Sequence, residues 1–74
     1  MSDRFEATVD HEAEALQREL AAWGLAVRVS PAPEGPNGPC ATVTGASGAV
    51  AAVLVNLLGL TPEDANDKIR AIAG

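Results

Sequence analysis

The sequence predicts an α+β fold, a two-layer sandwich in which a small three-stranded sheet is covered by helices in the order β-α-β-β-α-α. Three observations lead to this prediction. Short segments alternate between apolar and polar residues, which is the period of a half-buried strand. Other segments place apolar residues three and four positions apart between capping residues, which is typical of helices. At 74 residues, the chain is expected to form one domain over residues 1–74.

The first strand and the first helix are expected in the first 24 residues. Residues 4–9 alternate between polar and apolar side chains, which favours a strand. The same residues also continue the apolar spacing of the following helix, so a helical start stays open as the alternative. Asp10 is expected to cap that helix and Gly24 to end it, because glycine adopts a positive φ without strain. Glu14 and Arg18 are spaced to form an i,i+4 ion pair.

The second and third strands are expected over residues 25–29 and 40–44, which both alternate. Residues 31–39, between them, contain four prolines and the pair Asn37-Gly38, all typical of turns. We therefore expect the two strands to form a hairpin. Its semi-rigid connecting loop is expected to be too long for a two-residue turn, with a functional loop as the alternative.

An uncharged run of 28 residues extends from Gly35 to Pro62. Its second half predicts an apolar helix over residues 49–58, which Gly59 ends. Thr61 is expected to cap a last helix that has Pro62 at its first position. The apolar helix carries more apolar surface than one small sheet face is expected to cover, so part of it is predicted to contact another molecule.

Composition and charge argue against several classes of function. The net charge of −5 and the five scattered basic residues disfavour nucleic-acid binding. Cys40 and His11 are the chain's one cysteine and one histidine, so no intrachain disulfide, zinc site or activated thiolate is predicted. We predict a non-enzymatic protein without cofactor or metal. The apolar run is too short to span a bilayer and the first residues do not resemble a signal peptide, so a cytoplasmic protein is expected.

The turn before the apolar helix is a candidate anion site. Gly45, Ser47 and Gly48 follow a strand and open a helix, which resembles the glycine-rich turn of nucleotide-binding Rossmann enzymes. The run of βαβ units that such a fold needs is absent. The structural interpretation is that Gly45 makes the turn, Ser47 caps the helix and Gly48 allows close packing on the sheet.

The apolar helix is the candidate interface. The predicted contact residues are Val50, Val53, Leu54, Asn56, Leu57 and Leu58. Asn56, the polar residue on this helix, is compatible with three positions: the solvent edge, a backbone hydrogen bond in the core, or a contact between chains that fixes their register. The expected partner is a protein, and a homo-oligomer is the first candidate.

The segment from Val50 to Ile69 resembles the helix–Gly-Leu–helix unit of the C-terminal domain of the ribosomal stalk protein, a family related in shape to the Clp-protease adaptor fold. The strand and helix that end at Trp23-Gly24, followed by residues 25–29, are similar to that domain's second half, so the match requires a circular permutation. The resemblance implies three strands covered on one face by three helices, and adaptor-type work. The lysines of the stalk helices have no counterpart over residues 49–58.

The sequence therefore favours a non-enzymatic interaction or adaptor module that self-associates or docks through residues 49–58. One alternative is a stand-alone acidic inhibitor encoded by a mobile element, which requires its carboxylates to gather on one face. The other is a small anion- or nucleotide-binding protein that uses Gly45 to Gly48.

Overall fold

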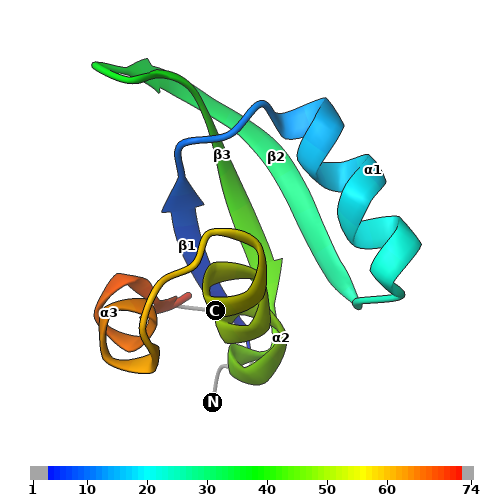
Figure 1. Ribbon diagram of the computed structural model, residues 1–74, viewed down its shortest axis with the longest axis vertical. Helices are drawn as coiled ribbons and strands as arrows, with labels where there is room; N and C mark the ends of the chain where they lie inside the picture. Colours follow the sequence, from blue (N-terminus) through cyan, green and yellow to red (C-terminus); the bar gives the residue numbers. More distant parts are fainter. Residues whose placement is uncertain (1–3, 73–74) are drawn as a thin grey trace.

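The computed structural model describes residues 4–72 as an α+β fold with an open, four-stranded antiparallel sheet (Figure 1). The elements in chain order are β1 (Phe5–Val9), α1 (Ala13–Trp23), β2 (Val27–Gly35), β3 (Gly38–Gly45), α2 (Ser47–Ala52), the π-helical turn η1 (Val53–Leu57), α3 (Pro62–Lys68) and β4 (Arg70–Ala71).

The strand order in the sheet is β2-β3-β1-β4. Because β3 is antiparallel to both β1 and β2, the latter two strands are parallel but do not touch. This connectivity is that of the split β-α-β, or ferredoxin-like, topology, with α3 added before the last strand. The expected three strands in the order β-α-β-β-α-α were therefore incomplete. The missed strand, β4, has only two residues, too few to show a period.

The first third of the chain matches the expected elements but not the expected helix cap. Residues 5–9 are a strand, which decides against the helical alternative. Gly24 ends α1 at a φ of 75°, as predicted. The cap is Glu12 rather than Asp10: Glu12 Oε2 accepts from the Ala15 N–H at 2.8 Å, and Oε1 accepts from the Glu14 N–H at 3.2 Å. The longer glutamate side chain thus satisfies two free amides of the first turn.

The two strands form the expected β-hairpin, but the proline-rich segment continues the strands and does not form the expected long loop. Strands β2 and β3 continue to Gly35 and Gly38, and the two-residue turn 36–37 joins them. Pro36 pre-sets its own φ for such a turn, and Gly38 follows it at a φ of 109°. A register shift between Ala32 and Gly35 marks a bulge. The hairpin extends beyond the rest of the sheet, as the ribbon shows (Figure 1).

The two faces of the sheet differ in chemistry. One face is covered by α1 and α2, and its strands contribute Ala7, Val9, Ala41 and Val43 to the core. On the other face, Thr8 lies opposite Thr42, which lies opposite Ser30. The next row is made of Arg28, Thr44, Glu6 and Arg70. The uncovered face is polar and charged, so water can solvate it without a partner.

The apolar helix forms the centre of the core. It is observed as α2 followed by η1, over residues 47–57, and it ends at Gly59 with a φ of 71°. Thr61 caps α3 as predicted, with its Oγ1 accepting from the Asp64 N–H at 3.1 Å. Ser47 does not cap α2: the N-cap position is Ala46, which has no side-chain acceptor.

Candidate functional site

Strand β2 forms one outer edge of the sheet, and the edge is longer than the opposite one. It has nine residues, whereas β4 at the other edge has two. An outer strand presents backbone N–H and C=O groups that no neighbouring strand pairs. The β2 edge is therefore a place where an extended segment of another chain can add to the sheet.

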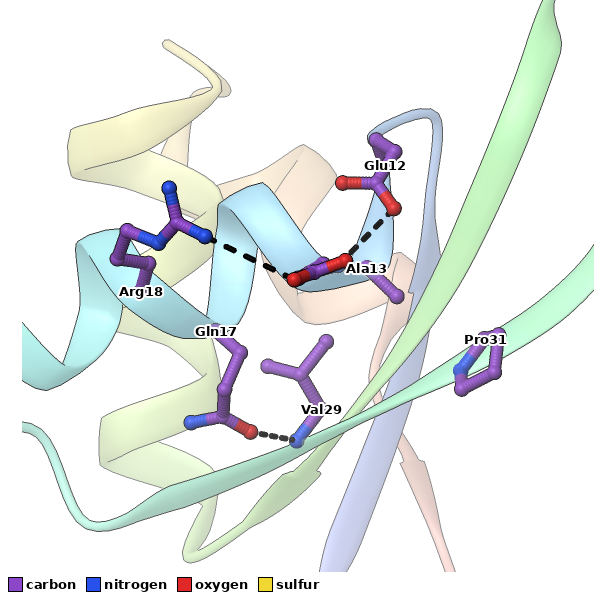
Figure 2. A pocket seen from close by; sticks show the side chains of 7 residues that line it. Glu12, Ala13, Gln17, Arg18, Val29 and Pro31 are labelled. Carbon is purple, nitrogen blue, oxygen red and sulfur yellow. Dashed lines mark hydrogen bonds and ion pairs between the residues drawn. The ribbon is translucent and has the colours of Figure 1, made fainter.

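One side-chain hydrogen bond shows which groups point outward from β2. The Val29 N–H donates to Gln17 Oε1 of α1 at 3.2 Å, so it does not pair with β3 (Figure 2). In an antiparallel ladder, alternate residues turn both backbone groups to the same side. Val27, Val29 and Pro31 therefore face outward, and Pro31 has no N–H to offer. The outward edge over these residues has two donors and three acceptors.

A hollow of about 560 Å³ lies beside this edge, between α1 and β2. Its lining residues are Glu12, Ala13, Glu14, Gln17, Arg18, Val29 and Pro31. Figure 2 shows Gln17 reaching from the helix across to the strand, with Val29 and Pro31 following one another along β2. The floor is apolar and the rim is charged, which suits an extended peptide whose side chains alternate.

The charges at the hollow are carried by exposed side chains. Arg18 lies 3.7 Å from Glu14, and the two side chains are 80% and 81% exposed, so the predicted i,i+4 pair is present but is fully hydrated. The amides of Ala15 and Glu14, which donate to the Glu12 carboxylate, hold the pKa of Glu12 below its usual value. Glu12 therefore remains ionised at neutral pH and fixes the start of α1.

The predicted interface residues on the apolar helix are placed in two groups. Val50, Val53 and Leu54 have no exposed surface and belong to the core. Leu57 and Leu58 are half-buried and pack against that core, and Asn56 is exposed. The sheet and helices thus cover the apolar side of this helix, which leaves Asn56 at the solvent edge or at a contact between chains and excludes the core position.

The predicted anion turn is bordered by mostly apolar residues, and its role in anion binding stays a prediction. Ser47 and Gly48 line a hollow of about 310 Å³ whose other lining residues are Phe5, Ala51, Val55, Pro62, Asn66 and Ile69, so no cationic side chain borders it. Gly45 is required for packing, because a Cβ there would lie 3.1 Å from the Ala26 carbonyl oxygen. A Cβ at Gly48 would meet nothing within 4 Å, so the close packing expected at Gly48 occurs at Gly45 instead.

Other reactive groups are accounted for locally. Cys40 is half-buried on the uncovered face, and its Sγ–H donates to Asp10 Oδ1 at 3.4 Å. His11 Nδ1 lies 3.1 Å from the Glu12 carbonyl oxygen. Within residues 4–72, no group of three or more His, Cys, Asp or Glu side chains is placed to hold a metal ion.

The β2 edge was not predicted from the sequence, because the prolines of residues 31–39 are typical of a loop. A signal was nevertheless present: Pro31 continues the alternation of Val27 and Val29, and proline in a strand is found where its missing N–H faces outward. The role of Gln17 had no local signal, since it depends on how α1 packs on β2, twelve residues along the chain.

Comparison with known proteins gives no match to a protein-family model, to a curated protein or to a solved structure. The resemblance to the stalk domain therefore stays an interpretation of the sequence. Among residues 4–72, no helix combines the length and apolar character needed to cross a bilayer.

Proposed function

We propose that this chain is a non-enzymatic protein-interaction module that binds an extended segment of a protein along the β2 edge. The observation that supports this most directly is the outward Val29 N–H, which is held by a side chain instead of a strand. A peptide strand offers a carbonyl in the same direction and adds further backbone hydrogen bonds, so it can replace Gln17. The hollow beside the edge offers room for the alternate side chains of that strand.

The apolar helix contributes to this function as support. Val50, Val53 and Leu54 are buried in the core against the sheet. A sheet held rigid in this way loses little conformational entropy when its edge binds a partner. Docking through residues 49–58, the expectation from sequence, would use the partly exposed residues of this helix, which include Asn56, Leu57 and Leu58 but not the buried Val50, Val53 and Leu54.

The acidic-inhibitor alternative finds less support. The carboxylates of the helix layer lie on α1 (Glu12, Glu14, Glu19) and on α3 (Glu63, Asp64, Asp67), and these helices lie at opposite sides of α2 (Figure 1). One basic target site does not reach both groups without covering α2 as well. The edge proposal needs no such distribution of charge.

Selection from a library of unstructured peptides tests the proposal. Selected peptides are expected to shift the amide NMR signals of Val27 and Val29 and the side-chain amide signals of Gln17. Val29→Pro removes the outward donor without removing a bond to β3, so it is expected to abolish binding and preserve the circular dichroism spectrum. Peptides whose signals map to the uncovered sheet face or to α3, and which bind Val29→Pro unchanged, contradict the proposal.

A further inference from the structure

We infer that the segment which adds to the β2 edge is β2 of a second copy of this chain, paired antiparallel about a two-fold axis at Val29. This inference rests on the proposed function and names its partner. An isologous contact requires one patch that complements itself. The outward backbone groups of β2 meet this requirement in one pairing register, and the two adjacent registers meet it less well.

The backbone groups are self-complementary in that register. With Val29 opposite Val29 of the second copy, the two residues exchange two N–H···O=C bonds. Val27 then lies opposite Pro31 of the second copy, so each Val27 N–H reaches a Pro31 carbonyl. Every outward N–H of residues 27–31 is used, and each Val27 carbonyl, which lies opposite the proline, is left to accept from water.

Moving the two-fold axis from Val29 to the next residue in either direction is unfavourable. One shift places Arg28 directly opposite Arg28 of the second copy, and like charges opposite one another destabilise a sheet. The other shift places Val27 opposite residue 33, which lies in the bulge where the strand no longer keeps its register. In the register centred on Val29, Arg28 lies opposite Ser30 on the uncovered face, and no like charges meet.

The groove beside the edge is also compatible with a second copy. Val29 of each copy lies over the apolar floor of the hollow, and the two hollows adjoin across the axis. Glu14 and Arg18 form the charged rim, and the two α1 helices are antiparallel in such a dimer. Each rim holds both signs of charge, so the Arg18 guanidinium of one copy can pair with a carboxylate of the other.

In the monomer, the Gln17 side chain occupies the backbone donor that the dimer needs, and we call this hydrogen bond between Gln17 and Val29 the Gln17 latch. Gln17 Oε1 accepts the Val29 N–H that the dimer requires, so the latch must open before the strands pair. Removing the side chain therefore favours the dimer, because the monomer loses a hydrogen bond that the dimer does not contain. Removing the Val29 donor has the opposite effect.

Sedimentation equilibrium over a range of concentrations tests the inference. Gln17→Ala is expected to lower the dimer dissociation constant by about tenfold, since two latches per dimer are removed. Glu19→Ala, an exposed change on the same helix away from the hollow, is the control and should leave the constant unchanged. Val29→Pro should give a monomer. A Gln17→Ala protein that is monomeric at millimolar concentration overturns the inference, as does a dimer that Val29→Pro leaves intact.

Two substitutions of opposite charge at one exposed position test the register and are not expected to unfold the protein. Ser30 is exposed, and in the dimer it lies opposite Arg28 of the second copy. Ser30→Arg should weaken the dimer by about fivefold and Ser30→Glu should strengthen it by a similar factor, each through two cross-strand pairs. The difference should shrink in high salt. Equal constants for both variants overturn the register.

The inference and the proposed function fail in different ways. Peptides that bind wild type and not Val29→Pro, in a protein whose latch-free variant stays monomeric, remove the second copy as partner and leave the edge as a binding site. Absence of both peptide binding and dimerisation removes both.

Discussion

At the scale of single residues, the two glycines of the turn before α2 have different roles. Gly45 is a cross-strand partner of Val27 and packs directly against it: an added Cβ would lie 3.1 Å from Val27 Cγ1 and from the Ala26 carbonyl oxygen. Gly48 lies in α2 and borders open space. A motif that resembles a phosphate-binding turn is thus explained in one position by close packing and is not required in the other.

Alanine substitutions separate these roles. Gly45→Ala should destabilise the protein by about 1–2 kcal/mol, because the backbone carbonyl of Ala26 has little freedom to move away. Gly48→Ala should stabilise it by about 0.5 kcal/mol, since alanine loses less entropy in a helix and meets no neighbour. Urea unfolding followed by circular dichroism measures both changes. Equal effects for the two variants would contradict the packing argument.

The Glu12 carboxylate makes the stability of the folded protein depend on pH. The amide donors of Ala15 and Glu14 lower its pKa in the folded protein, and these donors are absent from the unfolded chain. The stabilisation is therefore present above the ordinary glutamate pKa and is lost as the pH falls through the lower folded pKa. The thermal stability of wild type should exceed that of Glu12→Gln at pH 7, and the difference should narrow in acid. A difference that is constant from pH 7 to pH 3 would contradict this account.

At the scale of elements, the helix formed by α2 and η1 supports the sheet with one side and leaves its other side partly exposed. Leu54 has no exposed surface, and the Leu60 N–H donates to the Leu54 carbonyl oxygen at 3.1 Å where the helix ends. Asn56, two residues on, is exposed. The element therefore has a core side and a solvent side.

Substitutions on the two sides should behave differently. Leu54→Ala should cost about 2–5 kcal/mol of stability, through lost burial and the cavity that remains. Asn56→Ala should change stability by no more than about 0.5 kcal/mol. If Asn56 instead lies at a contact between chains, Asn56→Ala will change the mass in solution while its unfolding midpoint at low concentration is unaltered, so both quantities should be measured.

Elements with strong local signals were predictable from the sequence, and those that depend on tertiary contacts were not. Gly24 and Thr61 set helix ends through their own backbone or side chain, and the structure confirms both. The hairpin was predicted, but its two-residue turn was missed because proline has no general place in a strand, yet Pro31 faces outward and Pro36 occupies the turn. The β2 edge and the Gln17 latch arise only after α1 has packed on the sheet, so no local sequence pattern predicts them.

At the scale of the whole molecule, charge is divided between the two layers. The helices α1 and α3, together with the N-cap Glu12, carry six carboxylates and only Arg18 and Lys68 as cations, whereas the row across the uncovered sheet face has Arg28 and Arg70 with Glu6. The net charge of −5 alone did not show this division. Pairing at the β2 edge keeps both layers in water, because strands added side by side extend the sheet without covering either of its faces.

The short pairing of β4 with β1 determines how the fold responds to pulling. Arg4 and Ile72 lie next to each other, and the Ile72 N–H donates to the Arg4 carbonyl oxygen at 3.0 Å. Tension applied between these two residues pulls the two strands apart from one end. The hydrogen bonds between β1 and β4 therefore break one after another and not all at once. The two-residue β4 separates first, and β2, with the long edge at the far side of the sheet, bears no load until β1 begins to separate from β3.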